Sequence, residues 1–250
     1  MSRYLKYTIY HAKNTNENKN NNNTNIYNNK NNIYTDKNNN NNNKNNIDYA
    51  KHESIFFPSD QDSLFWCYFI ISKGDIEYDL LPNRNIVTTK QWKIQFISKI
   101  RENKPIVKMH KLDTLANIES NLANDPISTV QSIMTLFAID HINIVLVQNK
   151  TYFEMIHNSD ADIYIITEKP NKYVKKYGYE KATDQTLANI RNSLYKIHTI
   201  DKPIKSISSY TAPEILEIAT KLGIPTLQPV SGKNKTKTDL YQSIIQYFSQ

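Results

Sequence analysis

The stretch "INIVLVQNKTYFEMI", residues 142–156, decides how the chain folds. Its first half is β-branched and almost continuously apolar, and a second apolar run follows Lys150. Short runs of this composition are typical of β-strands. A third run, "DIYIITEK", occupies residues 162–169, and "KYVKKYGYEKA" at residues 172–182 offers a fourth strand with Gly178 as a break. The centre of the chain is therefore predicted to form a small, mainly antiparallel sheet.

Helical patterns flank this sheet on both sides. The stretch 62–74, "DSLFWCYFIISKG", is apolar nearly all round and is capped by Asp62 or Ser63, which predicts a core helix. Further helices are predicted at residues 87–103, 112–124, 126–140 and 184–198. In the second of the five, Lys90, Lys93, Lys99 and Arg101 are predicted to face solvent, and Pro126 is predicted to open the fourth. Residues 51–200 are thus predicted to form an α+β core of helices packed on the sheet.

The first 50 residues have a different composition. From Asn14 to Asn46, 20 of 33 residues are Asn, with few apolar side chains among them. Such a segment cannot offset its conformational entropy by burying apolar surface, so residues 1–50 are predicted to be a disordered tail.

The net charge of +7 is unevenly distributed. Residues 1–50 contribute +4, residues 51–200 contribute +1, and residues 201–250 contribute +2. Attraction to a polyanion is therefore assigned to the two ends, and the pI of about 9.1 does not indicate a basic cleft in the core.

Cysteine content and hydropathy narrow the class of protein. Cys67 is the single cysteine, which excludes an internal disulfide framework and a four-cysteine zinc site. No apolar run approaches the roughly 18 residues of a membrane span. The start of the chain also lacks the apolar core of a signal peptide. We expect a protein that is neither secreted nor transmembrane and that has no membrane partner.

The last part of the chain, residues 205–250, has explicit helix signals. Residues 211–214, "TAPE", form a capping-box pattern with Pro213 in the first turn, and Gly223 ends the apolar stripe that follows. A second capping pattern at residues 236–239 precedes another stripe. Two short helices of this kind must pack on each other to be stable, because neither is long enough to persist alone in water.

This two-helix pattern resembles the SAP and Rho-N class of helical modules. The resemblance covers about 40 residues and rests on Leu216, Ala219, Leu222, Gly223, Lys237, Leu240 and Ile244. It implies that the loop and the start of the second helix contact a nucleic-acid backbone. The predicted nucleic-acid-binding residues are Lys233, Lys235, Lys237 and Lys221. Protein docking and an inert cap on the core are the alternatives.

The core also resembles the OTU-type cysteine peptidases at one short motif. Asp60, Leu64 and Phe65 match that motif, but Ser63 stands where the nucleophile is expected. Lys172 and Tyr173 occupy the place of the late His-aromatic pair. The resemblance implies an inactive scaffold. A divergent peptidase of deubiquitinase type, with Cys67 approached by His141 or His157, is the alternative function. We predict no catalytic residue.

Other chemistry has little support in the sequence. With four glycines there is no phosphate loop or dinucleotide fingerprint, so no cofactor is expected. The segment "HNSDAD", residues 157–162, offers a histidine and two carboxylates, but it is interpreted as a solvated turn between strands rather than a metal site.

The pattern over residues 60–248 also resembles proteins of nucleocytoplasmic large DNA viruses. This resemblance rests on the Asn- and Lys-rich composition, the "DSLFWCYFIISKG" helix and the closing "KTKTDLYQSI" module. It implies a viral origin and a role in the virion or at a replication site, without supplying an activity. Taken together, the sequence leads us to expect a non-enzymatic scaffold in the virion or host cytoplasm, with nucleic acid and viral or host proteins as partners. A virion structural protein with no nucleic-acid role remains an alternative.

Overall fold

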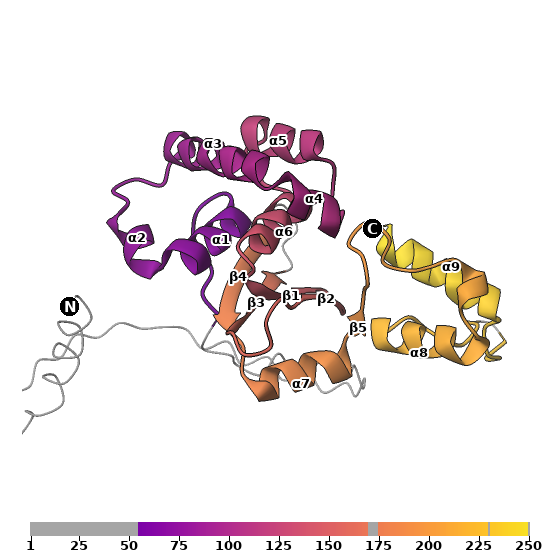
Figure 1. Ribbon diagram of the computed structural model, residues 1–250. Coiled ribbons are helices and arrows are strands. Elements are labelled where there is room, and N and C mark those ends of the chain that lie inside the picture. Colours follow the sequence, from indigo (N-terminus) through magenta and orange to yellow (C-terminus); the bar gives the residue numbers. More distant parts are fainter. Residues whose placement is uncertain (1–54, 170–174, 230, 250) are drawn as a thin grey trace, which may run out of the picture. The chain divides into compact units, whose positions relative to one another are not determined.

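The computed structural model describes residues 55–169, 175–229 and 231–249 (Figure 1). The predicted Asn-rich tail, residues 1–50, lies outside these described residues. Within them, nine α-helices pack with a five-stranded sheet, which confirms the α+β class.

The helices before the sheet are α1 (Ser63–Lys73), α2 (Asp75–Leu80), α3 (Ile86–Glu102), α4 (Lys104–His110), α5 (Leu115–Asn124) and α6 (Val130–Ile139). The strands are β1 (Asn143–Gln148), β2 (Thr151–Met155), β3 (Ile163–Lys169), β4 (Lys176–Lys181) and β5 (Tyr195–Lys196). Helix α7 (Asp184–Ser193) lies between the last two strands in sequence, and α8 (Ala212–Leu222) and α9 (Lys237–Phe248) close the chain.

The sheet is mixed, with strand order β4-β3-β1-β2-β5. Antiparallel pairing joins β1 to β2 and β3 to β4, as expected. Parallel pairing joins β1 to β3 and β2 to β5. Strands β1 and β3 are parallel because β2 ends beside the start of β1, where Met155 pairs with Ile144. The short loop 156–162 crosses this end of β1, and β3 then starts next to it, where Ile163 pairs with Asn143.

Both faces of the sheet are buried, which explains the almost continuous apolar sequence of β1. Ile144 and Leu146 join the main core cluster with α1 and α6. Val145 and Val147 point to the opposite face, where they pack with Leu187 of α7. The helices α1 and α6 therefore lie on one face and α7 on the other (Figure 1).

Helix α1 is the predicted core helix, and every residue from Ser63 to Ile70 is buried. Asp62 is its N-cap and accepts a hydrogen bond from the Phe65 backbone N–H at 3.4 Å. Helix α1 packs on β4, where the Tyr177 N–H donates to the Ser63 hydroxyl at 2.9 Å. The predicted cap and the predicted burial are both confirmed.

Gly178 was expected to break a strand, but it lies inside β4. Phe56 pairs with the neighbouring Tyr179 through two backbone hydrogen bonds of 2.9 Å, which brings residues 55–57 against the strand. A Cβ added at Gly178 would lie 2.7 Å from the Phe57 ring. Glycine is thus required here by the close approach of a neighbouring segment.

Lys93 corrects the predicted solvent face of α3. Its ammonium lies 2.7 Å from the Asp62 carboxylate, and the two side chains are 1% and 2% exposed. It also donates to the backbone carbonyls of Asp125 and Pro126 at 3.3 and 3.4 Å. Ser128 donates its N–H and its hydroxyl to Asp62 at 2.9 and 2.7 Å. This buried charge is therefore paired and hydrogen-bonded on all sides, as burial of a charge requires.

Three predicted helix boundaries were wrong. Helix α5 begins at Leu115 after the N-cap Thr114 rather than at residue 112. Helix α6 begins at Val130 after the N-cap Thr129, because Pro126 belongs to the preceding turn, where its carbonyl accepts from Lys93. Helix α7 ends at Ser193, and Tyr195 and Lys196 pair with β2 instead. The apolar residues beyond Ser193 thus cover the sheet edge, a tertiary role that helical spacing does not reveal.

We predict that Lys93→Met lowers the free energy of unfolding by about 3–5 kcal/mol, because it leaves the Asp62 carboxylate buried without its counter-charge. The measurement is urea denaturation of the full chain. The double variant Asp62→Asn/Lys93→Met should recover most of the loss, since the asparagine still caps α1. A single variant as stable as the wild type would contradict the role assigned to the pair.

Candidate functional site

The C-terminal module, residues 205–250, is built from α8 and α9 as predicted. Thr211 and Glu214 form a reciprocal capping box at the start of α8, and Thr236 and Asp239 form another at the start of α9. Gly223 ends α8 with a φ of 71°, a left-handed conformation that favours glycine. The two helices share a small apolar cluster of their own. Both capping predictions are confirmed.

The carboxyl ends of α8 and α9 face the core. A Cβ added at Gly223 would lie 2.2 Å from the Lys150 ammonium, which belongs to the β1–β2 turn. The Lys150 N–H donates to the Tyr247 hydroxyl at 3.4 Å, and the rings of Phe248 and Tyr195 are 6.4 Å apart. The last turns of both helices are therefore held against the sheet.

The first turns of α8 and α9 lie together at the opposite end. Hydrogen bonds from the Thr211 backbone and hydroxyl lower the pKa of Glu214, and the nearby charge of Lys237 lowers this pKa further. At 1.5 Å per residue, helices of this length place their first turns about 16 Å from their last turns. The module thus presents two helix N-termini on the side away from the sheet, each with the carboxylate of its capping box, Glu214 or Asp239, beside it.

Three of the four predicted lysines, Lys233, Lys235 and Lys237, are close in sequence to the start of α9. Lys233 is exposed in the hairpin that joins the helices, where its carbonyl accepts from the Gln228 N–H at 2.8 Å. Lys235 directs its ammonium along α9 to the Ser243 hydroxyl at 3.4 Å, and Lys237 occupies the first turn. None of the three forms an ion pair within the described residues.

Lys221, the fourth predicted lysine, lies elsewhere. It belongs to the last turn of α8, at the end that faces the core, and pairs with Glu217 at 3.2 Å. The structure therefore brings together Lys233, Lys235 and Lys237 but separates Lys221 from them. Residue spacing alone gave no sign of this difference, because it does not show that the loop returns the chain from the core-facing end of α8 to the opposite end of the module, where α9 begins.

The peptidase motif residues serve packing roles. Cys67 is fully buried, and its thiol donates to the Tyr177 carbonyl at 3.5 Å. Burial and then the Asp62 charge raise the pKa of this thiol far above its ordinary range, so the thiolate is disfavoured. Asp60 accepts hydrogen bonds from Tyr78 and Arg84. Lys172 and Tyr173 fall outside the described residues.

The two strand-flanking histidines lie far from Cys67. Tyr177, the contact of both Ser63 and Cys67, pairs with Glu168, whereas Asn143 pairs with Ile163 at the other end of β3. Glu168 and Ile163 are five residues apart on β3, which places the two ends of this strand about 16 Å apart. Both histidines lie near Asn143. His141 is two residues before it, and the His157 N–H donates to the Asn143 side chain at 2.7 Å. The geometry does not place an imidazole beside the thiol.

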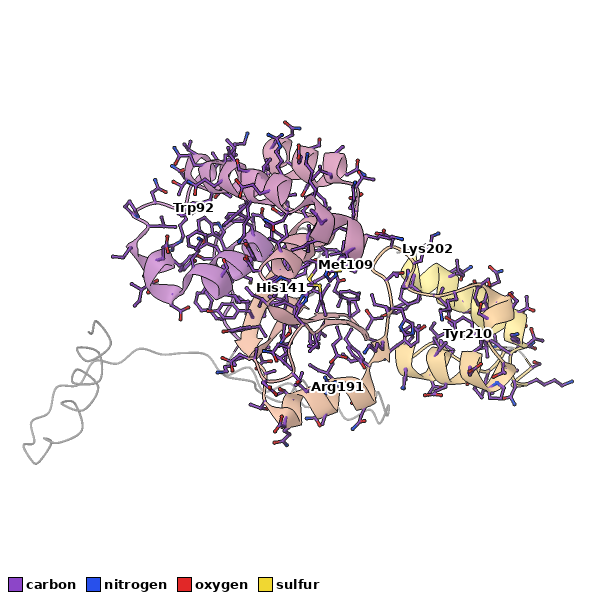
Figure 2. The ribbon with its side chains drawn as sticks, in the orientation of Figure 1. Trp92, Met109, His141, Arg191, Lys202 and Tyr210 are labelled. Carbon is purple, nitrogen blue, oxygen red and sulfur yellow. The ribbon has the colours of Figure 1, made fainter. Side chains whose placement is uncertain are left out.

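The histidines meet a third one instead. The rings of His110 and His157 are 5.5 Å apart, and those of His141 and His157 are 5.3 Å apart. The Nε2 atoms of His110 and His157 are buried without a hydrogen-bond partner. His141, marked in Figure 2, adopts a φ of 53° at the turn into β1. We call these three residues the histidine cluster.

Sequence reasoning missed His110 because it missed α4. The signal was present, since Pro105 follows Lys104 in a position typical of the first helical turn. The interpretation of residues 157–162 as a turn between strands fits the structure, and Asn143 holds that turn through its side chain. His157 is nevertheless partly buried rather than solvated.

Comparison of the chain with protein-family models, curated proteins and solved structures finds no significant match. Among the described residues, no group of three or more His, Cys, Asp or Glu side chains is placed to hold a metal ion, and this includes the histidine cluster. No helix in the same part of the chain is long and apolar enough to cross a membrane. The functional assignment therefore depends on geometry and charge.

The histidine cluster predicts a loss of stability in acid. Burial, followed by the charges of the neighbouring histidines, lowers the pKa of His110 and of His157 below the ordinary value of about 6.5. As pH falls, the unfolded chain therefore binds protons at these histidines before the folded chain does. The contribution of the two neutral histidines to the free energy of unfolding is complete above the unfolded-state pKa and is lost as pH falls through the folded-state pKa.

We expect the free energy of unfolding of His157→Gln to fall less than that of the wild type as pH is lowered through 6.5. Denaturant unfolding at a series of pH values measures this slope. His198→Gln removes an exposed histidine outside the cluster and is the matched control. Equal slopes for the wild type and His157→Gln would show that the cluster does not resist protonation.

Proposed function

We propose that this protein is a non-enzymatic scaffold whose C-terminal module binds nucleic acid through its phosphate backbone. The observation that carries the proposal is the convergence of the first turns of α8 and α9 beside Lys233 and Lys237, with the Lys235 ammonium further along α9 at Ser243. The opposite end of the module is attached to the core, so the lysine-bearing end faces outward.

The proposed contact uses two kinds of group. The ammonium groups attract phosphates as point charges, and the first backbone N–H groups of a helix point toward an anion placed at its start. The backbone N–H groups of Lys237 and Thr238, the first two of α9, are available to an anion. The capping box uses only the N–H groups of Thr236 and Asp239, which each donate to the other residue's side chain. Contacts of this type carry no sequence information.

Exposed apolar side chains on α2 support a scaffold role for the core. Ile76 and Leu80 are 60% and 76% exposed, and because they are four residues apart they lie on one face of the helix. Adjacent exposed apolar side chains are a feature of surfaces that bind other proteins. A virion or replication-site location, a viral origin and the identity of partner proteins stay predictions.

The peptidase alternative requires an accessible thiol. A ubiquitin-based probe that traps reactive thiols should leave the intact protein unlabelled, because Cys67 is buried and has no adjacent histidine among the described residues. Labelling at Cys67 would replace the scaffold assignment with a hydrolase.

We expect the full-length variant Lys233→Gln/Lys235→Gln/Lys237→Gln to bind duplex DNA more weakly and with a smaller salt dependence. Three phosphate contacts contribute a slope of about −2.7 in log affinity against log salt, which is roughly a 40-fold loss between about 50 and 200 mM salt. Fluorescence anisotropy with labelled duplex and single-stranded DNA measures both quantities.

Lys221→Gln is the matched control, because it removes a lysine from the same module at the end that faces the core. Its affinity should stay close to that of the wild type. If the wild type shows no binding at low salt, or if the triple variant binds as well as the wild type, the module has no role in nucleic-acid binding. The virion-structural alternative would then be favoured.

A further inference from the structure

A second basic surface lies in the core, on helix α4. A cleft of about 600 Å³ separates α4 from the start of α5 and is lined by Lys104, Lys108 and Lys111. This volume is in the range of clefts that hold a ligand. The sequence had assigned no basic cleft to the core, because the charge of residues 51–200 averages to nearly zero.

The three lysines of this cleft form no ion pair within the described residues. The two carboxylates in its wall are engaged elsewhere. Asp113 accepts from the Thr114 N–H and from the Asn117 side chain, and Asp201 accepts from the Gln131 side chain. These donors are uncharged, so the lining carries three ammonium groups against two carboxylates, an excess of one positive charge.

The arrangement is unfavourable for α4 by itself. Lys104 and Lys108 are four residues apart on a helix, a spacing at which like charges repel. Lys104 also lies in the first turn, where the helix dipole disfavours a cation. Lys111 adopts a φ of 50°, which is uncommon for a side chain with a Cβ. Lys108 lies in the last turn, where the helix dipole favours a cation, and Lys104 is also attracted by Glu119. The repulsion between Lys104 and Lys108 remains, and a bound anion would relieve it.

A smaller basic cleft adjoins the first along the linker to the module. It measures about 290 Å³, and its wall includes His198, Lys202 and Lys205. The turn at Thr199–Lys202 belongs to both clefts, since Asp201 lines one and Lys202 the other. Figure 2 marks Lys202 on this linker. The linker leads directly to α8, so the basic residues continue from α4 toward the module.

We propose that the two clefts form one phosphate-binding track, defined by Lys104, Lys108, Lys111, Lys202 and Lys205, which extends the nucleic-acid contact of the module onto the core. This inference rests on the proposed function of the module. The ligand chemistry is a series of closely spaced phosphates, and its source is the backbone of a nucleic acid. Thr114, the N-cap of α5, adds a positive helix end to the wall of the larger cleft.

The test uses the full chain with Lys104→Gln/Lys108→Gln/Lys111→Gln, and a control variant, Lys73→Gln/Lys90→Gln/Lys169→Gln. The control variant replaces three exposed lysines outside both clefts, so it removes the same amount of charge. We expect the α4 variant to lower the salt slope for duplex DNA by about 2.7, the value for three lost phosphate contacts. The control should change the slope much less. Thermal unfolding verifies that each variant is folded.

The outcomes separate this inference from the function of the module. An α4 variant that behaves like the control, together with a weakened Lys233/Lys235/Lys237 variant, overturns the track and leaves the module's function in place. A weakened α4 variant beside an unaffected module variant supports a phosphate site in the core and overturns the module's role.

A competition arm identifies the source of the phosphates. Inorganic tripolyphosphate should displace DNA from the wild type only weakly, because it spans a small part of the track. If tripolyphosphate binds tightly to the wild type, loses that affinity in the α4 variant, and DNA binding is unchanged by the same variant, then the cleft is a small-polyphosphate site and the nucleic-acid track is overturned.

Discussion

The buried ion pair between Asp62 and Lys93 determines how the helical layer is assembled. Asp62 caps α1, and Lys93 comes from the middle of α3. Ser128 and the carbonyls of Asp125 and Pro126 bring the turn before α6 to the same point. Removing two charges from water costs several kcal/mol per ion, so the pair is tolerated only because each partner is also hydrogen-bonded. The interaction fixes the relative position of three segments that are far apart in sequence.

The sequence predicted the elements whose signals are local. The strands were visible as short β-branched runs, and the helix starts at Asp62, Thr211 and Thr236 were visible from their capping residues. The burial of Lys93 was invisible, because its helical position matches a solvent face and its partner lies 31 residues away. Strand β5 was also missed, since two residues that follow a helix acquire strand geometry only by pairing with β2.

The candidate site shows the same division. The positions of Lys235 and Lys237 follow from sequence because they flank a capping residue, whereas the separation of Lys221 from them does not, because sequence does not show which end of α8 faces the core. The lysines of α4 were overlooked because charge was summed over 150 residues. In the structure, many acidic side chains of the core are committed to local ion pairs, including Asp60 with Arg84, Asp140 with Lys99, and Glu119 with Arg101. A nearly neutral domain can thus present unpaired lysines on one helix.

The sheet offers little room for catalysis at the place where parallel strands usually support it. Sites in sheets of this kind form outside the carboxyl ends of parallel strands. In this protein the longer parallel pair is β1–β3, and Gln148 and Glu168 lie at its carboxyl end. The Glu168 carboxylate accepts from Gln148 at 2.5 Å and from the Tyr177 hydroxyl at 3.0 Å, and it also pairs with Lys175 at 3.3 Å. This network is satisfied internally, and α1 packs beside it. Lysines on α4, on the linker and at the start of α9 are placed to hold a charged partner, and the proposed binding role depends on them.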